Sequence, residues 1–269
     1  MKHVRDNPEP AEPAEISDRQ SEIAEIVRTN GFAAIDDLSE RFSVSPQTIR
    51  KDVNLLCSFG LLRRTHGGVQ PASPGNLVYG MRRVLRLTEK RRIADLVAAR
   101  IPNGASLALS IGTTPEIVMQ ALGDHRDLRV FTNNLHVAMR ALDNASFEVT
   151  VPGGRLRHGD GDVIGAAAEA FFAGYNVDFG IFGVAAVDEA GGLLDFHEDE
   201  VTARRAVLEN STQAFLVLDH LKFDRRAHVR GGHITDVDAV FCDRDVPPGI
   251  AGLLTANNVA LATAEGANP

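Results

Sequence analysis

The sequence predicts a two-domain α/β protein, with a small N-terminal winged helix-turn-helix and a larger C-terminal domain in which helices cover a mainly parallel sheet. Three helix signals and a Gly-Gly turn lie close together in the first part, whereas short apolar β-type runs alternate with helical runs farther along. The stretch PASPGN between the two parts is typical of a linker. The predicted segments are a mobile tail over 1–16, the winged domain over 17–73, a linker over 74–92 and the α/β domain over 93–269.

The composition is typical of a soluble globular protein. The chain has 269 residues, 44% of them hydrophobic, and its 28 basic and 36 acidic side chains give a net charge of −8. No apolar run reaches the roughly 18 residues of a membrane span, and no apolar segment follows the first charges, so we expect a cytoplasmic protein that does not enter a membrane. Cys57 and Cys242 lie far apart and predict neither a disulfide nor a zinc site.

Three helices are predicted in the winged domain. The first covers about 19–29 and the second 36–41, each with apolar residues at helical spacing. The third has both ends marked, because Ser45 suits an N-cap, Pro46 suits the first helical position, and Gly60 suits the residue beyond the end.

The third helix has two different faces. Ile49, Val53 and Leu56 recur at the i, i+4, i+7 spacing of a buried stripe. The opposite stripe carries amide and cationic groups and consists of Gln47, Arg50, Lys51 and Asn54. The run LLRRTHGGV at 61–69 then predicts a strand, a Gly-Gly turn and a returning strand, which together form a wing. Residues 43–70 carry a local charge of +3 and residues 82–92 carry +5, so the excess acidity of the chain lies elsewhere.

This arrangement predicts recognition of the DNA major groove, where a helix of this kind presents its outward residues to base edges. The candidate base contacts are Gln47, Thr48, Arg50 and Lys51. The candidate phosphate contacts, which add affinity and register, are Ser45, Arg63, Arg64 and His66. A small helical domain for dimerisation or docking, with a merely solvated polar face, is the alternative interpretation.

The second domain alternates strands and helices at the spacing of a parallel sheet. The β-type runs lie at 106–111, 128–132, 147–152, 178–184, 214–219 and 239–243. The clearest helices lie at 115–122, 135–142 and about 198–210. We therefore expect polar residues that follow these strands to gather at one edge of the sheet.

Two strand ends carry candidate ligand contacts. In SIGTTPE, Gly112, Thr113 and Thr114 open a helix after a strand, so their N–H and hydroxyl groups suit a phosphate, although an ordinary capped turn explains them equally well. No Walker lysine follows, so nucleotide hydrolysis is not indicated. Asn133 and Asn134 follow the next strand and either face a ligand or form a turn.

Other polar residues are less informative. HEDE at 197–200 lacks the second histidine of a zinc-protease helix, so an acidic helix start is the better interpretation. Asp219 and Lys222 follow a strand and form either a surface pair or a site for hydroxyl and phosphate groups. We predict no catalytic residue, no metal site and no cofactor.

The run IDDLSERFSVSPQTIRKDVNLLCSFGLLRRTHGGV resembles the N-terminal signature of the DeoR family of bacterial repressors. Lys51 stands where that family has a second arginine. LSIGTT, VFTNN, VPGGRL, DFGIFG and VLDHLKF follow in the order seen in the family's sensor domains, which resemble ribose-5-phosphate isomerase and the CoA-transferase-like fold. The resemblance covers about residues 19–250.

The resemblance implies a homo-oligomeric repressor that binds double-stranded operator DNA and a phosphorylated polyol or sugar. IGTTPE, TNNLHVA and GLLDFHEDEV are most similar to the members that respond to sn-glycerol 3-phosphate, which implies this compound as inducer of glycerol metabolism genes. Ser110 stands where most relatives have Asp, which implies an altered polyol contact. The implied effector site consists of Gly112, Thr113 and Thr114 for the phosphate, with Asn133, Glu200, Asp219 and Lys222 as further polar contacts.

Three rival functions remain at the level of sequence. One is a regulator that responds to another sugar phosphate. A second is an isomerase-like enzyme that uses Glu200, Asp219 and Lys222 as acid and base groups, although such an enzyme has no need of a groove-reading helix. The third is a co-regulator whose winged domain binds protein instead of DNA.

Overall fold

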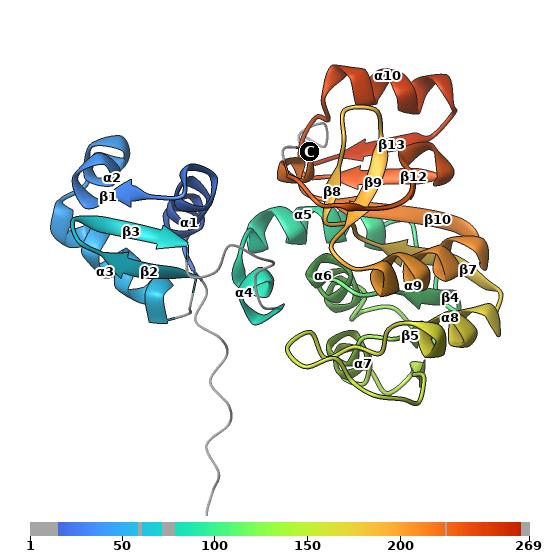
Figure 1. Cartoon of the computed structure of the whole chain (residues 1–269). Helices are drawn as coiled ribbons and strands as arrows, with labels where there is room; N and C mark the ends of the chain where they lie inside the picture. Colours follow the sequence, from blue (N-terminus) through green and yellow to red (C-terminus); the bar gives the residue numbers. More distant parts are fainter. Residues whose placement is uncertain (1–15, 59–60, 72–78, 224, 265–269) are drawn as a thin grey trace, which may run out of the picture. The chain divides into compact units, whose positions relative to one another are not determined.

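The computed structural model describes residues 16–58, 61–71, 79–223 and 225–264, and the chain forms two compact units, Met1–Arg86 and Leu87–Pro269 (Figure 1). The predicted tail lies outside the described residues except for Ile16, which is buried. The part of the predicted linker at 74–78 also lies outside them.

The first unit contains the three predicted helices and the predicted wing. Its sheet is antiparallel with the strand order β1-β3-β2. Gly68 begins β3, and a Cβ atom there would clash with the carbonyl oxygen of Ala33, so this close pairing of β1 with β3 requires glycine. The elements are α1 (Asp18–Asn30), β1 (Ala33–Ala34), α2 (Ile35–Phe42), α3 (Pro46–Ser58), β2 (Leu62–Thr65) and β3 (Gly68–Pro71).

The core of this unit confirms the predicted inward face of α3. Ile49, Val53 and Leu56 are fully buried, and full burial of such a side chain stabilises a fold by about 1.5–3 kcal/mol. They pack with apolar residues of α1, α2 and the wing, among them Ile23, Val27, Leu38 and Val69. The predicted N-cap is also confirmed, because Ser45 Oγ accepts a hydrogen bond from the Thr48 backbone N–H at 3.2 Å.

The second unit is built on a seven-stranded sheet whose neighbouring strands are all parallel, which confirms the predicted α/β class. The strand order is β13-β12-β10-β7-β4-β5-β6. The strands are β4 (Ser106–Leu109), β5 (Arg129–Thr132), β6 (Glu148–Thr150), β7 (Val177–Phe182), β10 (Ser211–Leu218), β12 (Ala239–Cys242) and β13 (Ala260–Thr263).

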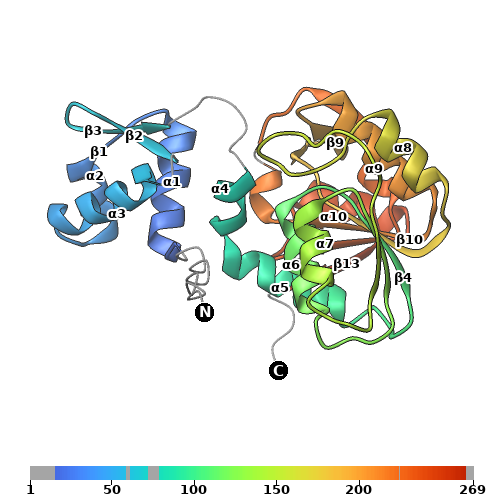
Figure 2. The same ribbon diagram turned by 90° about the horizontal axis from the view of Figure 1, so that it is seen from below.

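Helices cover both faces of this sheet (Figure 2). One face packs against α5 (Leu87–Ala98), α6 (Thr113–Ala121) and α7 (Leu135–Ala141). The other face packs against α8 (Ala166–Ala173), α9 (Glu198–Glu209) and α10 (Pro248–Ala256). Successive strand residues alternate between the two cores; Leu107 and Leu109 face one and Ala108 faces the other, so a strand buried on both faces is apolar throughout.

Two helices lie in the segment predicted as a linker, and the assignment of 74–92 as linker is therefore wrong in part. Tyr79–Val84 forms α4, and α5 begins at Leu87, inside the second unit. Ile93, Ala94 and Val97 of α5 are fully buried in the sheet core. The start of α5 is hard to recognise from the sequence because several basic residues precede its apolar stripe.

A small antiparallel sheet, in the order β11-β9-β8, lies beside the main sheet in the second unit. It consists of β8 (Ala186–Val187), β9 (Gly192–Asp195) and β11 (Val229–His233). Arg204 of α9 is almost fully buried, pairs with Asp195 at 2.9 Å and donates to the Gly231 carbonyl oxygen at 2.9 Å. This buried arginine joins α9 to the small sheet. In the described part of the chain, every helix is too short or too polar to cross a membrane.

Candidate functional site

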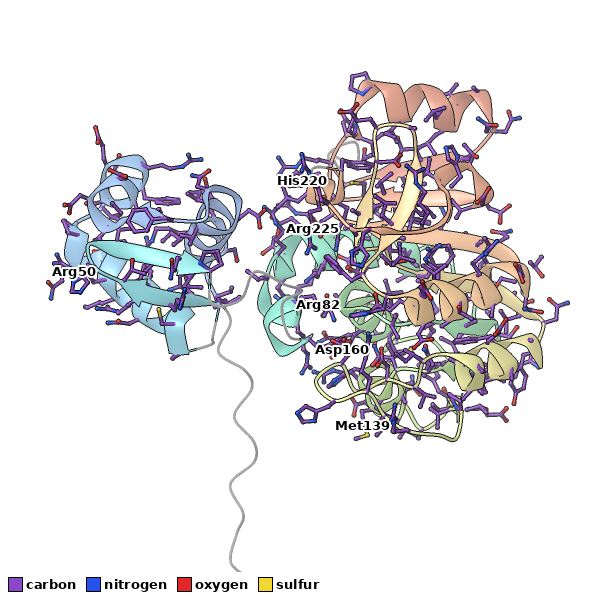
Figure 3. All side chains as sticks on the ribbon, in the orientation of Figure 1. Arg50, Arg82, Met139, Asp160, His220 and Arg225 are labelled. Carbon is purple, nitrogen blue, oxygen red and sulfur yellow. The ribbon has the colours of Figure 1, made fainter. Side chains whose placement is uncertain are left out.

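The outward stripe of α3 is exposed and free of acidic side chains. Gln47, Arg50, Lys51 and Asn54 are exposed, and Arg50 projects away from the unit (Figure 3). Asp52, the only acidic residue of α3, is buried on the opposite side. It accepts hydrogen bonds from Arg19 Nε and Gln20 Nε2, each at 2.7 Å. Arg19 therefore neutralises the charge of Asp52 inside the fold. As a result, Asp52 does not offset the positive charges of Arg50 and Lys51 on the exposed stripe.

The wing lies beside this stripe, because the Arg64 guanidinium donates a hydrogen bond to Asn54 Oδ1. Arg63, Arg64 and His66 are all exposed. At the other end of α3, the hydroxyl groups of Ser45 and Thr48 are hydrogen-bonded to each other at 2.9 Å. The structure thus places the predicted base and phosphate contacts on α3, its N-cap and the adjoining wing, an arrangement that can present cations and amides to a DNA groove.

The second unit has a topological switch point at β4. From β4 the chain continues outward through β5 and β6, and then returns to β7 on the other side of β4, from where it continues to β10, β12 and β13. In open parallel sheets, ligands bind outside the carboxyl ends of the strands at such a point. The carboxyl end of β4 is therefore the expected place for a ligand.

The segment after β4 carries the predicted phosphate contacts. Gly112 is the N-cap of α6, and its φ of +133° lies in a region that favours glycine. Glycine has no side chain with which to cap the helix, and Thr113 and Thr114 are buried in its first turn. The N–H groups and dipole of a helix start attract anions, so this end of α6 can hold a phosphate.

Two buried oxygen atoms at this edge have no hydrogen-bond partner among the residues that the structure describes. They are Ser110 Oγ and Asn133 Oδ1, in residues that are each 1% exposed. The two residues follow Leu109 and Thr132, which are paired in register on β4 and β5, so they lie at neighbouring strand ends. A buried polar atom without a partner costs about 1–3 kcal/mol, and hydroxyl groups of a ligand could supply the missing partners. The sequence singled out Ser110 only through its departure from the family pattern.

Asn133 also holds the hairpin that follows β6. Asn133 Nδ2 donates to the Val163 carbonyl oxygen at 2.7 Å, and the Val163 N–H donates to the Asn133 carbonyl oxygen at 2.9 Å. Next to it, the Leu135 N–H donates to the Gly161 carbonyl oxygen at 2.9 Å. The neighbouring Asn134, whose sequence allowed either role, caps α7 by accepting from the His136 N–H.

Arg157 of this hairpin binds three carboxylates, and no local sequence pattern singles it out. Its guanidinium lies 2.9 Å from Asp160, 2.7 Å from Asp162 and 2.6 Å from Glu200 of α9. Burial raises the pKa of the Asp162 carboxyl, although the hydrogen bond from Arg157 acts in the opposite direction. Glu200, a predicted effector contact, is therefore held in place by Arg157.

The remaining predicted contacts lie at the end of β10. Asp219 follows this strand, is buried, and caps the short 3-10 helix His220–Lys222 by accepting from the Leu221 N–H at 3.2 Å. Lys222, at the end of that helix, is half-buried. His220 is held by Asp243, whose carboxylate lies 2.8 Å from its Nδ1 and accepts from its N–H at 2.7 Å. Because β7 separates β10 from β4, these residues approach the same sheet edge from two strands away.

Comparison with known proteins gives matches for both units. Residues 19–74 match the DeoR-like helix-turn-helix domain, and residues 86–244 match the DeoR C terminal sensor domain. The chain is 43% identical over 244 residues to the glycerol-3-phosphate regulon repressor of Escherichia coli K12, covering 90% of this chain and 97% of that protein. The protein of the same name from Haemophilus influenzae is 43% identical over 249 residues, covering 92% and 97%.

Among solved structures, ribose 5-phosphate isomerase A from Methanocaldococcus jannaschii aligns over 50% of this chain and 53% of its own, with a TM-score of 0.37 and 16% identity. The two domain matches occur in the order that the motifs predicted, and together they span most of the chain. The chain therefore belongs to the DeoR family.

Proposed function

We propose that this DNA-binding repressor responds to sn-glycerol 3-phosphate, which releases it from operators of glycerol metabolism genes. The 43% identity to two proteins named glycerol-3-phosphate regulon repressors supports this choice of effector. The structural observation that carries the proposal is the pair of buried oxygens, Ser110 Oγ and Asn133 Oδ1, that have no hydrogen-bond partner among the described residues and lie at the strand ends from which α6 starts. Together they suit a small ligand with hydroxyl groups at one end and a phosphate at the other.

In this proposal, DNA is read by the exposed stripe of α3. Gln47, Thr48, Arg50 and Lys51 contact base edges, because an outward arginine or glutamine can bind guanine or adenine with two hydrogen bonds. The groups at the start of α3 and on the wing hold backbone phosphates, and they are Ser45, Arg63, Arg64 and His66. Two copies are needed to occupy paired half-sites, so we propose a homo-oligomer.

In the second unit, the effector phosphate binds Gly112, Thr113 and Thr114 at the start of α6, and Lys222, from the segment after β10, supplies a cation. The hydroxyl groups bind Asn133 and Ser110. Glu200 and Asp219 complete the polar surroundings. Effector binding changes the affinity for DNA through a coupling free energy, and a typical value of about 1–3 kcal/mol corresponds to about a 5- to 150-fold change, enough for a switch.

A DNA-release experiment tests the function. Operator fragments are selected from random DNA with the full-length protein, labelled, and followed by fluorescence anisotropy while sn-glycerol 3-phosphate is added. We expect release by sn-glycerol 3-phosphate and no release by glycerol or inorganic phosphate alone. Release by a different sugar phosphate only would contradict the effector assignment and leave the repressor function intact. Failure to select any DNA, or DNA binding that does not weaken as the salt concentration rises, would favour the protein-docking alternative.

We infer that the protein is not an enzyme. Proposed acid and base groups for an isomerase would be Glu200, Asp219 and Lys222, but Glu200 is already paired with Arg157 and Asp219 caps a helix. The full-length protein is therefore expected to leave ribose 5-phosphate and glyceraldehyde 3-phosphate unchanged in a coupled assay. Turnover that Glu200→Gln abolishes would overturn this inference.

A further inference from the structure

A histidine and a buried aspartate are paired at the carboxyl edge of the main sheet. Asp243 follows β12, and its side chain is 2% exposed. Asp243 Oδ1 accepts a hydrogen bond from the His220 backbone N–H at 2.7 Å, and Asp243 Oδ2 lies 2.8 Å from His220 Nδ1. An ionised carboxylate only accepts hydrogen bonds, so Nδ1 is the nitrogen that carries the hydrogen in the neutral ring. Asp243 therefore fixes both the orientation of His220 and its tautomer.

The other ring nitrogen of His220, Nε2, is open to a ligand. Among the described residues, Asp243 is the only one that bonds to the ring. The His220 side chain is 20% exposed, so the ring reaches the surface although Asp243 does not. Figure 3 shows His220 on the same side of the second unit as Asp160, which belongs to the hairpin that Asn133 holds. A ring held at one nitrogen and open at the other is the arrangement with which histidines bind ligands and carry protons.

The sheet brings His220 within reach of a ligand bound at the start of α6. Neighbouring strands lie about 4.8 Å apart, so the carboxyl ends of β4 and β10, which β7 separates, lie roughly 10 Å apart. Gly183 directly follows β7, so no side chain at that position stands between the two strand ends. A small ligand held by Thr113 and Thr114 after β4 can therefore extend toward the residues that follow β10.

The first charged side chains after β10 and after β12 cancel one another. Asp219 and Asp243 are buried carboxylates, and Lys222 and Arg244 are the first cations of the same two segments. Arg244 is already engaged, because its Nε lies 3.4 Å from Asp243 Oδ2. A phosphate dianion that binds beside them therefore adds negative charge that Lys222 alone does not balance.

A phosphate oxygen can bind His220 only if the ring takes up a proton. With its hydrogen on Nδ1, the neutral ring offers a lone pair at Nε2, and a phosphate dianion has no hydrogen to donate to it. The imidazolium donates from both nitrogens, so it can bind Asp243 and a phosphate oxygen at once. A proton added at Nε2 also offsets part of the negative charge that the ligand brings.

We propose that His220 is an effector-binding residue that takes up a proton when the effector binds, and that Asp243 is its positioning residue. The proposal rests on the proposed function, because sn-glycerol 3-phosphate supplies the phosphate oxygen that accepts from Nε2. The proton comes from the solvent, and no bond of the effector breaks. Because binding consumes a proton, the affinity for the effector falls as the pH rises, by at most about tenfold per pH unit.

Calorimetric titration of the full-length protein with sn-glycerol 3-phosphate tests this proposal. At pH 8 the phosphate is a dianion before it binds, since the second pKa of a phosphate monoester is about 6. Titrations in buffers of different ionisation enthalpy then count the protons taken up, and we expect roughly one half to one proton per effector for the wild type. The dissociation constant of the wild type should rise about 3- to 30-fold from pH 7 to pH 8.5.

His220→Gln keeps a hydrogen-bond donor but removes the group that titrates. At pH 7 it should raise the dissociation constant about 10-fold, the effect of losing a hydrogen bond between charged groups. Its dissociation constant should not change between pH 7 and pH 8.5, and it should take up no proton, which a merely structural role of His220 does not predict. Asp243→Asn should also reduce the proton uptake, because a neutral amide replaces the carboxylate that accepts from the imidazolium. Thermal unfolding shows whether each variant is folded.

The matched control is His228→Gln, at an exposed histidine of the same unit whose ring packs edge-on against that of Phe196. It should leave the dissociation constant and the proton uptake unchanged. Effector binding by the wild type without proton uptake, or uptake that persists in His220→Gln, would overturn the role of His220 and leave the proposed function intact. A wild type that does not bind sn-glycerol 3-phosphate would overturn the effector assignment and this inference with it.

Discussion

Arg157 and Glu200 join two elements that lie far apart in the sequence. Arg157 Nη1 is 2.6 Å from Glu200 Oε1, so the guanidinium connects the hairpin after β6 to the first turn of α9. The same guanidinium also binds Asp160 and Asp162 of its own hairpin. One cation therefore holds three carboxylates together at the carboxyl edge of the sheet.

Replacing Arg157 by Met should destabilise the second unit by about 3 kcal/mol at pH 7.5, because it leaves largely buried carboxylates without their cation. Burial already raises the pKa of the Asp162 carboxyl and Arg157 counteracts this, so without Arg157 the folded-state pKa of Asp162 lies further above its unfolded value. The lost stability should therefore be partly regained as the pH falls to 5, where protonation removes the repulsion. Urea unfolding at both pH values measures this. The control is Arg155→Met, which replaces an exposed arginine nearby and should hardly change the free energy of unfolding. If Arg157→Met lost the same free energy of unfolding at pH 7.5 and at pH 5, this explanation would be wrong.

Ser110→Ala should weaken the effector without harming the fold. Its hydroxyl group has no partner, so removing it should leave the stability unchanged or raise it slightly. Loss of one hydrogen bond to the ligand, about 1 kcal/mol, should raise the dissociation constant of sn-glycerol 3-phosphate about 5-fold. Calorimetric titration and thermal unfolding of the same sample measure both quantities. A variant that is less stable but binds the effector normally would remove Ser110 from the site.

Ser106→Ala, at the other end of β4, is the matched control and should show the opposite behaviour. Ser106 Oγ donates to Asp178 Oδ2 at 2.6 Å and accepts from the Asp178 N–H at 2.9 Å. Its hydrogen bonds lower the pKa of Asp178, so the stability that they contribute is present at neutral pH and is lost as the pH falls through that pKa. We expect Ser106→Ala to lower stability at pH 7 by about 1 kcal/mol, with a smaller effect in acid and no change in effector affinity.

Arg50→Ala and Asp52→Ala should separate DNA reading from folding on a single helix. Arg50 is exposed, so its loss should weaken specific operator binding by about 1–3 kcal/mol and leave stability unchanged. Asp52 is buried and paired with Arg19 and Gln20, so its loss should lower the stability of the winged unit by about 1–3 kcal/mol. Anisotropy with a selected operator and urea unfolding distinguish the two effects. Unchanged operator affinity in Arg50→Ala would exclude this residue from base recognition.

The two cysteines should differ in reactivity. Burial raises the pKa of Cys242 to about 12, and since the thiolate is the reactive form, this thiol should resist iodoacetamide at pH 8. Burial also raises the pKa of Cys57, but this side chain is only partly covered. Mass spectrometry of the native protein should show Cys57 modified first, and urea should make both react. Equal rates in the native protein would show that the β12 core opens readily.

Much of the fold was predictable because its signals are local. Ser45 and Pro46 mark the start of α3 through capping chemistry, and the spacing of Ile49, Val53 and Leu56 identifies its buried face. The parallel sheet was predictable because strands covered on both faces are apolar throughout. The start of α5 was missed because its basic residues obscure the buried stripe that contains Ile93 and Val97.

The sequence by itself determined the order of the elements, the cationic stripe of α3 and the helix start at Gly112, since each depends on residues within one or two turns. Only the tertiary structure decided that Asp52 is neutralised by Arg19, 33 residues away, and that Arg157 holds Glu200, 43 residues away. It also decided that Ser110 and Asn133 end neighbouring strands with unpartnered oxygens. Such relationships depend on strand order and register, which no local spacing encodes.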